Sequence, residues 1–403
     1  MSVWAELVGQ THVVTELQAA VQAARQPSRN SRNAMTHAWL FTGPPGSGRS
    51  NAARAFAAAL LCDAGGCGEC VTCRTALSGA HPDVTLVRTE RLSIGVDEAR
   101  ELAARGSRAP TVGAYQVIVV EDADRLTIQA ANALLKSFEE PPPRTVWALC
   151  APTLEDVVVT IRSRARHVNL RTPTDSDVAA LLDQRDGIDP ALAAHAARVA
   201  QGHIGRARAL ARSEEARNSR HQVLKVPASL TSVGACLQAA EMLVNMAKQD
   251  AERRTGELDA RELAELREAL GFGAKGARPR QTAAALRELE DEQKMRSRRM
   301  QRDALDLVLT ELTTWYRDVL SVQMGVVDPT DLDSAASGVG LINADMRDQI
   351  ARAARETSPE QTIRQVDALL AAREALEHAA NHLLAMESLL LSLGACQSVV
   401  FHG

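Results

Sequence analysis

The sequence of 403 residues has few aromatic side chains, no long apolar run and little net charge. Aromatic residues make up 3% of the chain, which argues against a nucleic-acid surface on which bases stack. No apolar run approaches the roughly 18 residues that span a bilayer, and the N-terminus lacks signal-peptide features, so we expect a cytoplasmic protein without membrane contact. A formal net charge of -4 leaves any nucleic-acid binding to local arginine clusters.

The order of apolar segments predicts an α/β domain followed by helices. Hydrophobic residues make up 45% of the chain, which is enough for real cores, and the length suggests two or three domains. Short apolar strands alternating with helices predict a parallel sheet with ligands at the strand C-termini. We expect strands at 39–41, 84–88, 117–120 and 146–150, a long helix over 287–323 and a last helix over about 359–393. The predicted domains are 1–170 (α/β), 171–220 (small helical) and 221–403 (all helical).

Residues 43–50, with the sequence GPPGSGRS, have the spacing of a phosphate-binding loop between a strand and a helix. In the pattern G-x-x-x-x-G-K-[ST], backbone N–H groups cradle phosphates, the Lys reaches the outer phosphates and the hydroxyl ligates Mg2+. The candidate nucleotide-binding residues are Gly43, Gly46, Gly48, Arg49 and Ser50. Arg49 replaces the Lys, and the two side chains are not interchangeable. The alternative is a Gly/Pro turn without a ligand.

The acidic pair Glu121-Asp122 follows the apolar strand 117–120. A nucleotide-hydrolysing domain needs acids for Mg2+ and for the attacking water at the end of a strand beside the loop. The usual order is Asp then Glu, and here it is reversed, which displaces both carboxylates. We therefore expect no ATP hydrolysis, while ATP and Mg2+ binding stays open. The alternative is a pair of acids that only caps a turn.

Four cysteines, Cys62, Cys67, Cys70 and Cys73, have the spacing C-x4-C-x2-C-x2-C in a Gly-rich segment. In a reducing compartment, this clustering favours a closed tetrahedral zinc site with a structural role. Free thiols or a redox pair are the alternatives. Cys150, Cys236 and Cys396 lie in apolar segments, and we expect them in the core.

Two segments are rich in arginine. Residues 161–167 place Arg162, Arg164 and Arg166 at alternating positions, which indicates either a solvated basic face or an Arg supplied to a neighbour's ATP. Residues 294–302 are interleaved with acids, and we interpret them as a solvated helix face rather than a nucleic-acid contact.

Together, the segments HAWLFT at 37–42, ANALLK at 131–136, EEPP at 139–142 and TIRSR at 160–164, with the loop and the cysteines, resemble the bacterial clamp-loader AAA+ family. The specific motifs cover about residues 1–215. The resemblance implies an AAA+ P-loop domain, a helical lid and a helical collar, and places Gly9-Gln10 over the adenine.

Within this family the chain is similar to the delta prime class, whose phosphate loop is degenerate. We expect one collar domain and no polymerase-tethering extension of the kind found in tau. The resemblance implies a hetero-pentamer with gamma/tau motor subunits and delta, acting with the sliding clamp and primer-template DNA. It assigns Arg164, after Ser163, as an arginine finger acting in trans, although Ala165 replaces the family's Cys. The resemblance also places Arg206 at the sensor 2 position, with a packing role as the alternative, and Thr153 at the sensor 1 position. The alternative is an ATP-hydrolysing motor subunit.

Overall fold

The structure is a computed structural model that describes residues 2–26, 34–89, 93–269, 280–328, 340–378 and 380–398. The chain divides into two compact units, residues 1–212 and 213–403. Within the described ranges, no helix is both long enough and apolar enough to cross a membrane.

The first unit is built on a parallel sheet of five strands in the order β2-β3-β4-β1-β5. The strands are β1 (Ala38–Thr42), β2 (Val84–Val87), β3 (Gln116–Val120), β4 (Thr145–Ala151) and β5 (Arg166–Asn169). Every pairing is parallel, so the predicted sheet is confirmed. The fifth strand was not predicted, because β5 pairs only with β1 and buries only Val168.

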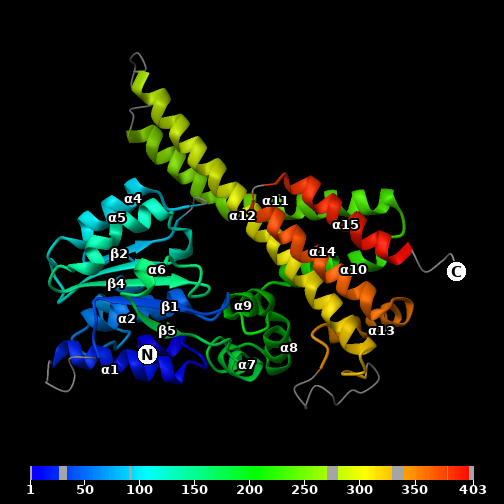
Figure 1. The fold of residues 1–403 in the computed structure, drawn as a ribbon, viewed down its shortest axis with the longest axis horizontal. Helices are drawn as coiled ribbons and strands as arrows, with labels where there is room; N and C mark the ends of the chain where they lie inside the picture. The colour runs from blue at the N-terminus through cyan, green and yellow to red at the C-terminus, as the bar shows by residue number, and fades with distance from the viewer. Residues whose placement is uncertain are drawn as a thin grey trace. The chain divides into compact units, whose positions relative to one another are not determined.

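Two helical layers cover the sheet. The helices of this part are η1 (Val3–Glu6), α1 (Thr11–Arg25), α2 (Arg49–Leu61), α3 (Val71–Ser78), α4 (Val96–Gly106), η2 (Ala123–Arg125), α5 (Ile128–Glu139) and α6 (Val159–Arg162). Alternate strand residues enter different cores, since successive side chains point to opposite faces. Trp39 and Phe41 pack with α1 and α2, whereas Leu40 and Trp147 pack with α4 and α5. Figure 1 shows these two layers on either side of the sheet.

Three short helices complete the first unit: α7 (Asp175–Gln184), α8 (Pro190–Ala200) and α9 (Ile204–Arg212), which contact one another. Thr174 and Asp177 form a capping box at the start of α7, and Asp189 caps α8. The helix expected to run on to about residue 220 ends at Arg212, because Ser213 caps a new helix by accepting from the Ala216 N–H.

The second unit is entirely helical in its described part. Its elements are α10 (Glu214–Ser229), α11 (Val233–Ala269), α12 (Arg280–Gln323), η4 (Ala344–Met346), α13 (Arg347–Glu356), α14 (Pro359–Glu377) and α15 (His382–Ser398). The long helix over 287–323 is confirmed within α12. The single last helix is wrong: it is interrupted before α15, where Asn381 Oδ1 accepts from the Leu383 and Leu384 N–H groups. The expected break at 271–279 and the side chain of Cys396 lie outside the described residues.

Helices α11 and α12 run side by side over much of their length (Figure 1). Part of their contact is ionic, because Arg296 is 7% exposed and its guanidinium lies 2.7 Å from Asp259 Oδ1 and 2.9 Å from Glu262 Oε1. Arg299 is also buried. The prediction that residues 294–302 form a solvated face is therefore wrong for these two arginines. For Arg296, carboxylates of the facing helix satisfy a charge that the sequence alone leaves unpaired.

A second buried polar group, Asp318 of α12, fixes the chain that leads into α13. Asp318 is fully buried, and its carboxylate accepts from the Ile342 N–H at 3.1 Å and the Asn343 N–H at 2.8 Å. It also accepts from Asn343 Nδ2 at 2.9 Å and from Arg317 Nη1 at 2.9 Å. These bonds tie residues 342–343 to α12.

We predict that Asp318→Ala lowers the free energy of unfolding by about 3 kcal/mol, because it leaves several buried donors without an acceptor. The matched control is Asp306→Ala in the same helix, whose carboxylate is half exposed beside Arg373 and whose loss should cost about 0.5 kcal/mol. Urea denaturation followed by circular dichroism measures both. Equal losses for the two variants would show that the buried network is not stabilising.

Candidate functional site

The phosphate loop leaves β1 and ends at α2 in a conformation that needs its glycines. Gly46 has φ 84° and Gly48 φ 91°, values that side chains disfavour. At Gly43 a Cβ atom would lie 2.6 Å from the Leu170 carbonyl oxygen, and at Gly46 it would lie 2.5 Å from His203 Cγ. Gly48 is the N-cap of α2, so the loop delivers its backbone to the helix N-terminus. Arg49 and Ser50 form the first turn of that helix.

Arg49 lies folded over the loop. Its Nη1 donates to the Gly43 carbonyl. Burial lowers the pKa of Arg49, while nearby charges, Asp124 and Asp122 among them, act in the opposite direction. The guanidinium that stands in the Lys position is therefore bonded back to the first residue of the loop.

The acids Glu121 and Asp122 do not follow the strand beside the loop. Strand β4 lies between β1 and β3, so our expectation of direct adjacency is wrong. Glu121 is bound by Arg54 of α2, whose Nε lies 2.6 Å and Nη2 2.5 Å from the same Glu121 oxygen. Asp124, which follows in η2, has its pKa raised by burial, with a contribution from Asp122. The sequence did not predict Arg54 and Asp124 as residues of this site, because the residues that surround them depend on the strand order.

The short helices of the first unit reach the loop through His203, which precedes α9 and lies against Gly46. The Arg206 N–H donates to His203 Nδ1 at 3.2 Å, and burial lowers the pKa of His203. Gln10 is buried; its Nε2 donates to the Arg171 carbonyl, and its Oε1 accepts from the Arg171 N–H at 3.1 Å. His203 lies three residues before Arg206 in the sequence, and only the structure identifies it as the residue in contact with the loop.

Thr153, the residue expected at the sensor 1 position, follows β4. Its hydroxyl donates to Asp156 Oδ2 at 2.9 Å, and its N–H donates to the same oxygen. The neighbouring Pro152 carbonyl accepts from the Gly43 N–H at 3.1 Å, which ties the end of β4 to the start of the loop.

The three arginines of residues 161–167 lie in different elements and share no face. Arg162 ends α6, Arg164 follows it, and Arg166 begins β5, where its guanidinium lies 5.2 Å from the Trp39 ring centre. Arg164 donates to the Thr160 carbonyl at 2.9 Å and to Ser163 Oγ at 3.2 Å, and pairs with Glu139 at 2.7 Å. Its side chain is 36% exposed, so it is accessible from outside the chain.

The four cysteines of the predicted site come together between the end of α2 and the first turn of α3. All four sulfur atoms lie within 4.8 Å of one another. The Cys62 sulfur lies 3.8 Å from those of Cys67 and Cys70, and Cys67 lies 4.0 Å from Cys73. A tetrahedron with zinc–sulfur bonds of about 2.3 Å has edges of about 3.8 Å. The four thiols can therefore hold one zinc ion. Cys150 and Cys236 are buried outside this cluster, as predicted.

The surroundings favour thiolates at Cys62 and Cys67, whereas burial raises the pKa of Cys73. Burial opposes ionisation of Cys62, but backbone N–H groups, with Cys67 and Gly66 the largest contributors, outweigh it and lower its pKa to about 6. The pKa of Cys67 is lowered by the backbone N–H groups of Cys70 and Glu69. Because zinc binds the thiolate, these donors suit the cluster to a metal.

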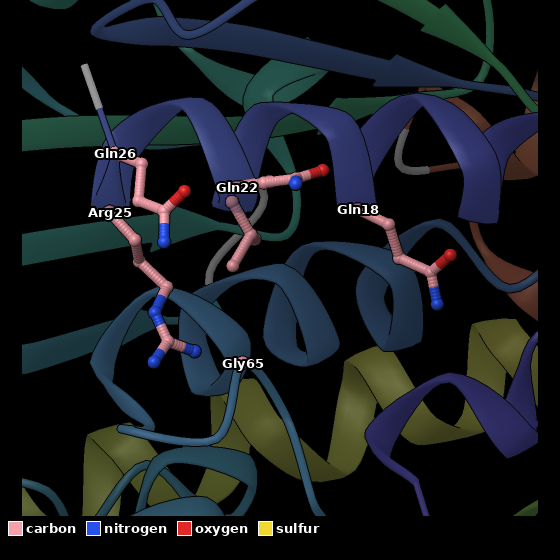
Figure 2. A pocket seen from close by; sticks show the side chains of 6 residues that line it. Gln18, Gln22, Arg25, Gln26 and Gly65 are labelled. Atoms are coloured by element: carbon pink, nitrogen blue, oxygen red, sulfur yellow. The ribbon is translucent and has the colours of Figure 1, made fainter. Parts of the chain in front are cut away.

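The cysteine loop also borders a pocket of about 230 Å³ (Figure 2). The pocket is lined by Gln18, Val21, Gln22, Arg25, Gln26 and Gly65. Arg25 Nη2 donates to the Asp63 carbonyl, so this arginine joins α1 to the cysteine loop. The pocket shares no residue with the phosphate loop and lies outside the candidate nucleotide site.

Comparison with known proteins shows a similarity in the N-terminal region. Residues 18–174 match the family described as DNA polymerase III, delta subunit. This match covers less than half of the chain, and it shows that the region is similar to subunits of DNA polymerase III. The fold predicted from the resemblance, an α/β P-loop domain followed by helices, is confirmed.

Individual relatives include both classes of clamp-loader subunit. The chain is 36% identical over 184 residues to DNA polymerase III subunit gamma/tau of Mycobacterium bovis, covering 44% of this chain and 30% of that protein. It is 39% identical over 134 residues to subunit delta' of Pseudomonas aeruginosa, covering 32% and 41%. It is 30% identical over 198 residues to subunit delta' of Bacillus subtilis, covering 48% and 60%. The chain thus spans under a third of the gamma/tau relative's length, and the matches do not separate the two classes.

We predict about one zinc per purified chain and near-complete loss of metal in Cys73→Ser, together with a lower thermal midpoint, because a structural site needs all four thiolates. Cys236→Ser, which alters a buried thiol outside the cluster, is the control and should keep the metal. Elemental analysis and thermal unfolding provide the measurements. Metal-free native protein, or full retention of zinc by Cys73→Ser, would refute the site.

Proposed function

We propose that the chain is a clamp-loader subunit of the delta prime class. In this role it supports ATP-dependent opening of the sliding clamp and its loading on primed DNA, in a hetero-pentamer with gamma/tau motor subunits and delta. Its domains are then an AAA+ core (1–170), a lid (171–220) and a collar (221–403). One pair of observations carries the proposal. In the chain's own phosphate loop, Arg49 replaces the Lys and is bonded to the Gly43 carbonyl, whereas Arg164 is accessible to a neighbouring subunit.

Arg164 is the group that would act on a neighbour's ATP. A guanidinium supplied in trans neutralises charge that develops on the transferred phosphoryl group. Arg164 pairs with Glu139, which is 49% exposed. Exposed ion pairs contribute little, so the exchange of Glu139 for a phosphate would cost little. The bond from Arg164 Nη1 to the Thr160 carbonyl would hold the other nitrogen of the guanidinium in place meanwhile.

The second candidate is an ATP-hydrolysing motor subunit of the gamma/tau type, favoured by the 36% identity to that subunit and by the intact loop glycines. Against it stand Arg49 in the Lys position and the Arg54 side chain bound to Glu121. Accurate positioning of metal and water is most of catalysis at such sites.

We predict that Arg164→Ala slows the ATPase of the assembled complex, with clamp and primed DNA present, by about 10^3-fold. Assembly, followed by size-exclusion chromatography, should be intact, because the side chain has only one ion pair at the surface. Arg162→Ala is the matched control, since it removes a neighbouring arginine that ends α6, and should leave the rate within a factor of about 2. An unchanged rate in Arg164→Ala would reject the finger role.

We predict that the isolated chain shows no ATP turnover, because Glu121 is held by Arg54 rather than free to serve a metal. Phosphate release from ATP by the purified chain measures this. Gly48→Asp, which places a charged side chain at φ 91° in the loop, separates true turnover from contamination. Turnover that Gly48→Asp abolishes would establish the motor candidate instead.

A further inference from the structure

The interior of the phosphate loop contains a buried hydroxyl that its protein surroundings leave unsatisfied. Ser47 is 3% exposed, and its Oγ has no hydrogen-bond partner in the part of the chain that the structure describes. The oxygen is directed into the loop, since a Cβ atom on Gly43 would lie 2.7 Å from it. Buried hydroxyls almost always have a partner. The N-terminus of α2, which opens at this loop, favours a negatively charged one.

The acid that would serve a metal at this site is already neutralised. Glu121 follows β3 and its side chain is 7% exposed, and both Nε and Nη2 of Arg54 contact its Oε1. A charge-assisted contact of this kind is among the stronger side-chain interactions. A Mg2+ ion at the loop would therefore find this carboxylate occupied by a guanidinium.

Arg54 and Arg49 place two permanent cations in the first two turns of α2, next to the loop. Arg49 donates to the Gly43 carbonyl across the loop. In a nucleotide site with Mg2+, the metal supplies the positive charge that allows phosphate oxygens to approach the acids. Here Arg54 supplies a fixed positive charge at the strand end, and no metal is needed to balance Glu121.

We propose that the loop binds a phosphate-bearing anion without Mg2+, and that Arg54 is the residue that removes the metal requirement. Ser47 Oγ and the loop N–H groups contact the phosphate, and Arg54 acts through Glu121. This property goes beyond the clamp-loading role and is independent of Arg164. A nucleotide and free phosphate share this chemistry, so the experiment includes both.

The test is calorimetric titration of the full chain with ADP, ATP and inorganic phosphate, each in EDTA and in excess Mg2+. We expect at least one anion to bind with a Kd that differs by less than about twofold between the two conditions. A nucleotide that binds while free phosphate does not identifies the source as a nucleotide. Binding that requires Mg2+, or absence of binding by all three at millimolar concentration, would overturn the proposal. The titration measures anion binding and not the ATPase rate of the assembled complex. A failure of this proposal can therefore be distinguished from a failure of the function proposed above.

Two variants test Arg54 itself. Arg54→Gln leaves Glu121 unpaired, and we expect metal-free binding to weaken about tenfold or more and Mg2+ to restore it. Arg100→Gln, which removes an exposed arginine of α4, is the matched control and should change neither Kd. If Arg54→Gln still binds the anion equally well with and without Mg2+, Arg54 is not the residue that removes the metal requirement.

Glu121→Gln keeps an acceptor for Arg54 and removes the negative charge, so it answers the question even if Arg54→Gln fails to fold. Anion binding should be unchanged or tighter in this variant, because no carboxylate then balances the positive charge of Arg54. In a site that depends on Mg2+, the same change would weaken binding, and that outcome would contradict the proposal. Circular dichroism confirms that each variant is folded.

Discussion

The parallel direction of all five strands is the constraint on which the first unit depends. Because every strand ends at the same edge of the sheet, the phosphate loop after β1, the acids after β3 and the turn after β4 all lie at that edge. The order β2-β3-β4-β1-β5 then decides which of them meet. The Gly43 N–H donates to the Pro152 carbonyl after β4, whereas the acids after β3 are reached from α2 by Arg54.

Arginine–carboxylate pairs take over roles in this protein that apolar contacts or metals fill elsewhere. In the second unit, Arg296 is buried between Asp259 and Glu262, and Arg220 pairs with Glu311 inside the helical core. In the first unit, Arg54 occupies Glu121 at the strand end. Buried pairs of this kind add little net stability but are costly to break, so they specify which surfaces meet.

Much of the fold could be predicted from the sequence, since β1, β3 and β4 consist almost entirely of buried residues and their apolar runs are unambiguous. Strand β5 could not, because an edge strand of Arg, His and Asn has no such pattern. The break between α14 and α15 was not predicted, because the apolar Leu pattern of a helix continues on both sides of it. In the sequence, only Asn381, which caps α15, marks the break. In the candidate site, the loop glycines and the cysteine spacing could be recognised in the sequence. The contact of Arg54 with Glu121 could not be predicted, because it depends on the strand order.

The cysteine loop and the phosphate loop are connected through the first ten residues. The Val3 N–H and Ser2 Oγ both donate to the Gly66 carbonyl in the cysteine loop. At the other end, Gln10 is bonded to Arg171, just past β5, and its Nε2 reaches the Ser47 carbonyl at 3.5 Å.

Between these ends, Glu6 pairs with Arg185 and Arg208 of the small helices. Since a closed metal site fixes the position of its loop, zinc bound by the four cysteines would fix one end of a segment that also holds the small helices and the phosphate loop. A metal site without chemistry of its own would in this way help to set the geometry of the phosphate loop.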